Sequence, residues 1–461
     1  MMSTVELPIW LFVLILAFAV VTFASHFLFP SVRWFLRRRA ERVVARLNAR
    51  LTRPIEPFKL LRRQDMIQRL VYDPGVISAV TEHARENGLR EDVAFETATR
   101  YAREIVPSFS ATAYFGFAIR LARLIARAFY RVEAAPIRAD VQTALASDAA
   151  VVFVINHRSN MDYVLVTYLA AERSALSFAA GEWARVWPLG ALVRAMGAYF
   201  VRRKSRNPLY RKVMARYVQM ATQGGVAQAI FPEGGLSLDG QVGLPKLGLL
   251  SYIVDGFDAE TGRDVVFVPV AVNYDRVMED RVLVRAAQQA QRKFRFRWRS
   301  AARYFFRHAV QRLTGRFLKF GYAAVTYGQP LSLREFSLGP RKDVITDLGR
   351  ELMSRVRNAV PITPIPVLAS LLREHDLPIA EDRLLDLLGQ KLEMLSATDS
   401  DMIEMSEPPL VEAQYAIRHL KMRKMIEETD QGIVISAGND ALIDYYLGSI
   451  RHNFDAAAAK Q

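Results

Sequence analysis

Apolar residues in the first third of the chain recur mostly every three or four positions. The stretches 73–88 (DPGVISAVTEHARENG) and 91–106 (EDVAFETATRYAREIV) show this spacing, which is typical of amphipathic helices. Asp73 followed by Pro74 is a start signal for the first of them. The pattern predicts a helical subdomain over about 54–129.

From about Arg138 the pattern changes to short β-rich runs separated by longer helical stretches. The runs are 149–155 (AAVVFVI), 226–235 (VAQAIFPEGG) and 264–272 (DVVFVPVAV), and a helical stretch at 207–223 separates the first two. Alternation of this kind predicts an α/β fold in which helices flank a sheet.

Beyond about residue 332 the pattern is again mostly helical, through about residue 390. We expect a linker at 395–409 (LSATDSDMIEMSEPP) and then, over 411–436, a helix and a hairpin that turns at Asp430, Gln431 and Gly432. Two interpretations of this tail are open. It is either a winged-helix-like module or, as is commoner for such tails, a segment that packs on the core.

The amino terminus contains an apolar run, Leu7–Phe29, of 23 residues without a charged side chain unless His26 is protonated. At about 1.5 Å per residue, a helix of this length spans a bilayer core. A cleaved signal peptide is the competing interpretation, but the start MMSTVE has no positive charge, and the run exceeds the usual length of about 7–15 residues. We therefore expect a retained transmembrane helix, with Trp10 and Trp34 near the two interfaces.

Arginines crowd the sequence after this run, and by the positive-inside rule they predict that the rest of the chain is cytoplasmic. They are at positions 33, 37, 38, 39, 42, 46, 50 and 53.

Together the sequence patterns predict four regions of the chain. These are a transmembrane anchor (1–32), a basic juxtamembrane and helical subdomain (33–135), an α/β domain (136–335) and a mostly helical C-terminal region (336–461).

The composition limits the classes of site and partner. With 461 residues, 51% of them hydrophobic, the chain is long enough for a large core or for two to three domains. It contains no cysteine, which excludes disulfides, thiolate metal sites and a cysteine nucleophile. Its net charge of +15 favours an anionic partner, and nucleic acid, anionic lipid and a phosphorylated substrate all qualify.

The loop 156–162 (NHRSNMD), between a predicted strand and a predicted helix, holds the main candidate chemistry. On one continuous helix, His157 and Asp162 would point about 140° apart. A turn between them would instead bring the two side chains together, so that one imidazole nitrogen is held and the other accepts a proton as a general base. The alternative is structural: Ser159 caps the helix, Asp162 interacts only with its dipole, and His157 is an ordinary loop histidine.

Other catalytic motifs are absent from the sequence. The seven histidines form no HExxH pair, so a zinc enzyme is a poor fit, and no GxSxG, Walker A or GxGxxG pattern occurs. These absences disfavour serine hydrolase, P-loop and dinucleotide-binding functions.

Three downstream segments add candidate binding groups. The segment GAYFVRR ends in Arg202 and Arg203, whose planar guanidinium groups suit phosphate, although adjacent arginines are more often a solvated loop. The segment FPEGG, 231–235, has two glycines that let backbone NH groups approach a ligand, although an ordinary turn has the same composition. Pro269 interrupts the third apolar run, which predicts a strand edge or a bulge beside a site.

In this order, NHRSNMD, GAYFVRR, FPEGG and VFVPVAV resemble the four sequence blocks of the glycerolipid acyltransferases, whose first block is His, four residues, Asp. Within that superfamily the chain most resembles the membrane-bound glycerol-3-phosphate acyltransferases. The stretches RYAREIV, MDYVLVTYL, WPLGALVRAMGAYFVRR and DYYLGSIRH extend the resemblance through most of 101–452. It implies a glycerolipid-acyltransferase-type mixed sheet, with 136–335 as the catalytic domain.

The resemblance also implies roles for individual residues. His157 would deprotonate the sn-1 hydroxyl of glycerol 3-phosphate for attack on an acyl thioester, and Asp162 would orient His157. Arg203, with Arg202 beside it, would hold the phosphate. Glu233 and Gly234 would line the glycerol pocket, and the further expected substrate contacts are Arg158, Ser159, Gly235, Lys246 and Pro269.

One position departs from the family pattern. Members usually carry an arginine after the paired small residues of the third block, and Leu236 stands there in this chain. Lys246 is a candidate for the missing phosphate contact, and Arg158 and Lys204 are others. Because FPEG is also common among lysophosphatidic acid acyltransferases, the acceptor is less well specified than the reaction class.

A basic aromatic stretch, 285–319, contains eleven arginine or lysine residues and no acidic residue. In RKFRFRWR the aromatic side chains alternate with the charges. Such a stretch suits an anionic membrane surface, single-stranded nucleic acid, or docking of an acidic acyl carrier protein or of coenzyme A. Its helical stripe, 306–320, equally suits packing on the core.

We therefore expect a single-pass protein of the cell inner (cytoplasmic) membrane that acylates the sn-1 position of glycerol 3-phosphate. No metal or cofactor is expected, and acyl-CoA or acyl-carrier protein would be a co-substrate. Anionic membrane lipids are an expected partner and nucleic acid is not. The alternatives are a lysophosphatidic acid or dihydroxyacetone phosphate acceptor or, in another class, a membrane-anchored nucleic-acid-binding regulator.

Overall fold

In the computed structural model, residues 8–170, 175–181, 189–202, 205–289, 319–339, 342–398 and 402–458 are described. Eight of the strands in these ranges build one sheet. They are β1 (Arg131–Ala134), β2 (Ala150–Ile155), β3 (Ser177–Gly181), β4 (Tyr199–Val201), β5 (Gln228–Ile230), β6 (Val265–Tyr274), β7 (Tyr322–Tyr327) and β8 (Leu331–Ser332).

The strand order is β1-β7-β6-β2-β5-β3-β4, and β8 also pairs with β6. The neighbours from β6 through β4 are parallel, and β1 is parallel to β7. By contrast, β7 and β8 pair with β6 in the antiparallel direction. The sheet is therefore mixed and mainly parallel, which confirms the expected α/β class.

Continuous apolar runs form the central strands because both faces of the sheet are covered. Every residue of β2 and β6 is buried. Successive side chains of a strand point to opposite faces, so β2 contributes to two cores. Val151, Phe153 and Ile155 belong to one core, and Ala150, Val152 and Val154 belong to the other.

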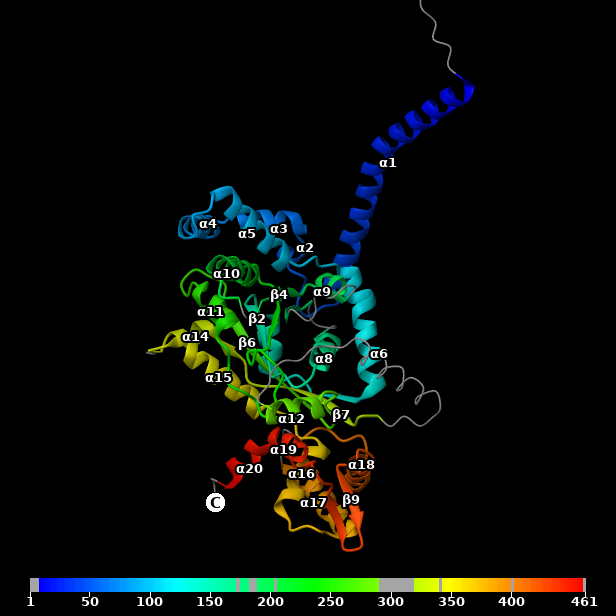
Figure 1. The fold of residues 1–461 in the computed structure, drawn as a ribbon, viewed down its shortest axis with the longest axis vertical. Helices are drawn as coiled ribbons and strands as arrows, with labels where there is room; N and C mark the ends of the chain where they lie inside the picture. Colours follow the sequence, from blue (N-terminus) through cyan, green and yellow to red (C-terminus); the bar gives the residue numbers. More distant parts are fainter. Residues whose placement is uncertain are drawn as a thin grey trace, which may run out of the picture.

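Helices cover the two faces of the sheet, as Figure 1 shows. Within the α/β region they are α7 (Ala139–Ala146), α8 (Met161–Ala170), α9 (Leu189–Ala195), α10 (Pro208–Gln223), α11 (Gly248–Asp255), α12 (Asp280–Gln288) and α14 (Leu333–Ser337). The helix α8 packs in one core with C-terminal residues from Ile362 onward, whereas α10 and α11 pack in the other core with residues 348–360.

The helices expected in the predicted helical subdomain, over about 54–129, are present. They are α2 (Pro57–Leu60), α3 (Arg63–Val71), α4 (Pro74–Glu86), α5 (Glu91–Ile105), a π-helical segment η1 (Thr112–Ala118) and α6 (Ile119–Phe129). The start signal acts as expected, because the Asp73 carboxylate accepts a hydrogen bond from the Gly75 backbone N at 3.0 Å. Helices α4 and α5 pack against α10 and so join this subdomain to the sheet.

The amino-terminal helix α1 (Ile9–Asn48) projects from one end of the molecule (Figure 1). Described apolar side chains on it, such as Trp10 and Phe18, are exposed. Most side chains from 21 to 37, including Trp34, lie outside the described residues. Among the described residues, no helix is both long and apolar enough to cross a membrane, so the transmembrane anchor is not confirmed.

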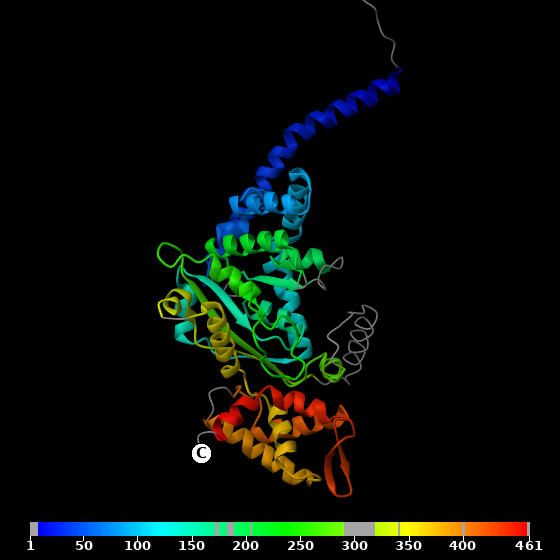
Figure 2. The same cartoon turned by 60° about the vertical axis from the view of Figure 1, so that its left-hand side comes forward.

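From about residue 360 onward, the C-terminal region gathers at the opposite end from α1, whereas the helix before it packs on the sheet, as Figures 1 and 2 show. Its hairpin joins β9 (Ile426–Thr429) to β10 (Gly432–Ile435) where the sequence predicts a turn. Residues of this region share one core with the sheet, so the tail packs on the core. The helices are α15 (Val344–Asn358), α16 (Pro364–Glu374), α17 (Glu381–Thr398), α18 (Pro409–Met422), α19 (Asp440–Gly448) and α20 (Arg451–Ala458).

Two expectations for the second half of the chain need comment. The predicted linker at 395–409 begins too early, because α17 continues to Thr398 and buries Leu395 in the core. Residues 399–401 of that linker lie outside the described residues, as does 290–318 of the basic aromatic stretch.

Candidate active site

The NHRSNMD loop leaves the carboxyl end of β2 and enters α8, as the sequence predicts. Ligands of open parallel sheets bind at this end of the strands. Asn156 ties the start of the loop to β6, because its amide oxygen accepts from Val272 N at 2.8 Å and its amide nitrogen donates to Val272 O at 3.0 Å. The loop therefore starts from a fixed point on the sheet.

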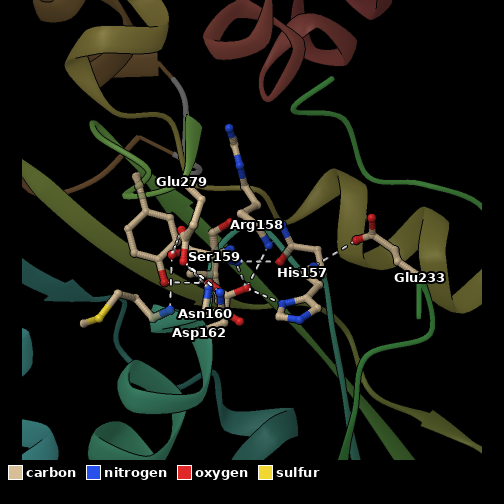
Figure 3. A network of polar contacts seen from close by, with 11 residues as sticks. His157, Arg158, Ser159, Asn160, Asp162, Glu233 and Glu279 are labelled. Atoms are coloured by element: carbon tan, nitrogen blue, oxygen red, sulfur yellow. Dashed lines mark hydrogen bonds and ion pairs between the residues drawn. The ribbon is translucent and has the colours of Figure 1, made fainter. Parts of the chain in front are cut away.

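The turn brings His157 and Asp162 together (Figure 3). The imidazole Nδ1 lies 2.8 Å from Asp162 Oδ2, and both side chains are buried. A carboxylate only accepts hydrogen bonds, so Nδ1 carries the proton and donates it. The second nitrogen, Nε2, then carries the lone pair that a general base needs.

The Asp162 carboxylate is itself fixed by several donors. Its Oδ2 also accepts from the backbone N of Arg158 at 2.7 Å and of Ser159 at 3.0 Å. Its Oδ1 accepts from the Tyr274 hydroxyl at 2.6 Å. Burial beside Asp162 raises the pKa of Tyr274 well above its ordinary value, so the hydroxyl stays a donor. Asp162 thus holds the imidazole in one tautomer and one orientation.

The structural role of Ser159 and the pairing of His157 with Asp162 occur together. Ser159 Oγ accepts from Met161 N at 3.1 Å, and Ser159 N donates to Asp162. The same hydroxyl donates to Glu279 Oε2 at 2.8 Å. Ser159 therefore lies just before α8 and accepts from the first backbone N–H of that helix. Its hydroxyl is engaged within the protein, where we expected a substrate contact.

The FPEGG segment lies against the same histidine. Glu233 Oε1 accepts from the His157 backbone N at 2.9 Å, and the Phe231 ring packs on the imidazole with centroids 4.5 Å apart. Burial raises the pKa of Glu233 to about 7, although hydrogen bonds from His157 N and Gly243 N oppose the shift. Glu233 therefore holds the backbone that carries His157.

Gly234 is required by its conformation and by its neighbour. Its φ is +63°, and an added Cβ would lie 2.8 Å from Lys246 Cδ and 3.1 Å from Lys246 Nζ. The exposed Lys246 side chain therefore passes over the FPEGG turn, next to the candidate site. An added Cβ at Gly235 would meet no such neighbour, and Leu236 packs on the core. Neither residue has a charged side chain that could contact a phosphate.

Arg158 points away from the imidazole (Figure 3). It is 1% exposed, and its Nη1 donates to Asn273 Oδ1 at 2.6 Å. Its guanidinium carbon lies 5.1 Å from the ring centroid of Tyr445 on α19. Because it is buried against the C-terminal region, its position does not support the expected phosphate contact.

Arg202 also has a protein partner. Its Nε donates to Glu104 Oε1 of α5 at 2.7 Å, and its Nη2 donates to the other carboxylate oxygen. The guanidinium carbon lies 5.3 Å from the Tyr101 centroid and 5.4 Å from the Tyr210 centroid. Arg202 therefore joins β4 to the helical subdomain. Arg203 and Lys204 lie outside the described residues.

Pro269 corrects one expectation, because β6 is a central strand and not an edge. Pro269 is in register with Val154 of β2 on one side. On the other side β8 pairs only at 266–267 and β7 only from residue 270, so Pro269 falls in the gap between them. Its carbonyl accepts from Gly328 N at 2.9 Å, and its missing N–H faces the same gap.

The structure adds Asn273, Tyr274 and Glu279 to the site, which sequence reasoning missed. Asn273 and Tyr274 end β6, which continues past the end of β2 at Ile155, the partner of Val270, and so runs alongside the loop. The sequence feature that could have predicted them is a pair of polar residues at the carboxyl end of an apolar run. Glu279 gave no signal, because no spacing relates it to a loop 120 residues away in sequence.

Two protein-family models match parts of this chain. Residues 137–273 match the family model described as acyltransferase. Residues 310–459 match the model described as glycerol-3-phosphate acyltransferase C-terminal region.

Curated relatives carry the name glycerol-3-phosphate acyltransferase. Those of Ectopseudomonas mendocina and Pseudomonas putida are each 27% identical to this chain and cover 85% of it. The chain covers 49% of each of them, so it spans about half the length of the curated relatives it matches. Among solved structures, a 1-acyl-sn-glycerophosphate acyltransferase from Thermotoga maritima matches 64% of this chain and 95% of that chain, with 17% identity and a TM-score of 0.32.

Proposed function

We propose a function from the premise that this chain belongs to the glycerol-3-phosphate acyltransferase family. It transfers an acyl group from an acyl thioester to the sn-1 hydroxyl of glycerol 3-phosphate and so forms lysophosphatidic acid. The observation that carries the proposal is the buried pair His157 and Asp162, whose Nδ1–Oδ2 distance is 2.8 Å.

In the proposed reaction His157 Nε2 removes the proton of the acceptor hydroxyl. The hydroxyl oxygen attacks the thioester carbonyl carbon, and the C–S bond breaks as the tetrahedral intermediate collapses. The proton on Nε2 then passes to the leaving thiolate, which restores the neutral imidazole. Asp162 stabilises the transient imidazolium through Nδ1 and stays ionised. No step requires a metal or a bound cofactor.

The acceptor phosphate requires a positively charged side chain that can reach it beside the candidate site. Arg202 is paired with Glu104 and Arg158 is buried, so neither side chain offers a free phosphate contact. Lys246 lies beside Gly234 with its side chain exposed, and we propose it as a phosphate contact. Arg203 remains the second proposed contact, from its match to the second block.

The membrane and the donor are further parts of the proposal. The apolar run of α1 and the arginines after it support a membrane anchor with the catalytic domain on the cytoplasmic side of the inner membrane. Anionic lipids are then the partner of the arginines that follow the apolar run and of the basic aromatic stretch 285–319. The acyl donor is acyl-CoA or acyl-carrier protein.

One observation favours a second acceptor. Leu236 occupies the position at which the family usually has an arginine, and lysophosphatidic acid acyltransferases also carry FPEG. Purified protein with labelled acyl donor should therefore be given glycerol 3-phosphate, lysophosphatidic acid or dihydroxyacetone phosphate in parallel. The proposal expects turnover with glycerol 3-phosphate; turnover with lysophosphatidic acid alone would replace it.

A further inference from the structure

A second carboxylate holds the catalytic loop from the side opposite Glu233 (Figure 3). Glu279 Oε2 accepts from Ser159 Oγ at 2.8 Å. Glu279 Oε1 accepts from the Asn160 side-chain nitrogen at 2.9 Å and from the Asn160 backbone N at 3.3 Å. Three donors of the loop therefore converge on one half-buried acid.

Glu279 does not serve the helix that it precedes. It stands at the N-cap position of α12, where an acidic side chain would ordinarily accept from the backbone of its own helix, but it makes no such hydrogen bond. Instead, its carboxylate points at the loop. Burial raises its pKa, and the hydrogen bonds from Ser159 and Asn160 oppose that shift. The loop thus supplies the hydrogen bonds that this half-buried carboxylate needs.

The next residue, Asp280, is directed toward the C-terminal region. Its Oδ2 accepts from the Tyr446 hydroxyl of α19 and from Arg423 Nη2, directly after α18. The Tyr446 hydroxyl in turn accepts from Val277 N at 3.2 Å and from Arg423 Nη1 at 3.0 Å. The segment 277–280 is therefore fixed between the catalytic loop and the C-terminal helices.

We propose that Glu279 is a positioning residue for His157 and Asp162, and that the C-terminal region keeps it in place through Asp280, Arg423 and Tyr446. This inference rests on the proposed acyl transfer. Glu279 hydrogen-bonds to the loop residues between His157 and Asp162, so it sets the turn that brings those two side chains together. The C-terminal region then has a role in catalysis without contacting the reacting atoms.

The first test replaces Glu279 and separates kcat from KM. Glu279→Ala removes all three hydrogen bonds, and kcat should fall about 10- to 100-fold because the imidazole is misplaced. The KM for glycerol 3-phosphate should stay within about threefold, because no substrate contact is lost. Glu279→Gln should recover part of the rate, since its amide oxygen still accepts from Asn160. Glu260→Gln, an exposed acid in the loop before β6, is the matched control and should equal wild type.

The second test follows the loop itself and needs no activity. Glu279→Ala should speed amide hydrogen exchange in peptides that cover 156–163, while exchange in β6 stays as in wild type. Unchanged exchange in that loop, or a kcat within twofold of wild type for Glu279→Ala, overturns the inference. If Glu279→Ala does not fold, kcat and amide exchange are measured on Glu279→Gln instead. Both should then lie between wild-type values and those of a loop without its Glu279 contacts. Wild-type values for Glu279→Gln overturn the inference.

The third test concerns the link to the C-terminal region. Tyr446→Phe is used because removing Asp280 would leave the buried Arg423 charge unpaired. It should lower kcat about 3- to 10-fold alone and less than twofold in the Glu279→Ala background, because both act through one connection. Additive effects, or no effect of Tyr446→Phe, overturn the link. A wild-type chain that transfers no acyl group contradicts the proposed function instead, and the exchange experiment still decides the positioning role.

Discussion

At the scale of single residues, His157 depends on Asp162 for both its tautomer and its orientation. In Asp162→Asn, an amide cannot accept from Arg158 N, Ser159 N, His157 Nδ1 and the Tyr274 hydroxyl together, so one donor loses its partner. We expect kcat to fall roughly 10²- to 10⁴-fold. A steady-state assay with saturating substrates measures this, with circular dichroism as the folding control. A kcat above one tenth of the wild-type value would argue against the dependence of His157 on Asp162.

The buried Glu233 carboxyl predicts a pH dependence of stability. Its pKa is raised from 4.5 to about 7, so the folded state holds a proton that the unfolded state has lost. The stability contributed by this group therefore falls as pH rises from about 4.5 to 7. Glu233→Gln does not titrate, so its stability relative to wild type should rise by about 2 kcal/mol between pH 5 and pH 8. Urea unfolding of both proteins at the two pH values measures the difference, and a constant difference would contradict the burial.

At the scale of secondary-structure elements, the bond between Arg202 and Glu104 joins β4 to α5. Part of this pair is exposed, so its net contribution is only about 1 kcal/mol. Glu104→Gln should lower the free energy of unfolding by that amount and leave the KM for glycerol 3-phosphate unchanged. Denaturant unfolding and steady-state kinetics measure the two effects. A KM increase of tenfold or more would show that Arg202 acts on the substrate and not only on the fold.

The elements that the sequence pattern predicts well are those with an unbroken period. The buried runs of β2 and β6, the amphipathic α4 and α5, and the β9–β10 hairpin all occur where expected. Pro269 is misjudged because the sequence does not reveal that β6 changes partners at that residue. The end of α17 is misjudged because Leu395 continues the buried stripe through a polar segment.

The predictions for the site also divide into contacts that local sequence spacing predicts and contacts that depend on the tertiary fold. The pairing of His157 with Asp162 follows from local spacing once a strand precedes and a helix follows it. The partners of Arg158, Arg202 and Glu279 depend on which elements meet in space, and nothing in the linear sequence records this. Two arginines expected near a phosphate are therefore engaged with Asn273 and Glu104.

At the scale of the whole molecule, the sheet separates two cores. The C-terminal helices α16, α17, α18 and α19 share one core with α8, and α15 packs in the other. The helix α1 lies at the other end (Figure 1).

If α1 is the anchor, arginine substitutions at Leu14 and Ala17 should shift the protein out of the membrane fraction, because each charge costs about 2.5–3.5 kcal/mol at the bilayer centre. Fractionation with a carbonate wash measures this, and Leu338→Arg, at a residue that is 81% exposed, is the control. Retention of the double variant would argue against the anchor.

The measurement that most directly tests the central claim is acylation of glycerol 3-phosphate by wild type and His157→Ala, side by side, with the position of the acyl group determined in the product. Wild type should form 1-acyl product. His157→Ala, folded to the same extent, should be slower by roughly 10²- to 10⁴-fold. Equal rates for the two proteins, or no acylation of glycerol 3-phosphate by wild type, would contradict the claim.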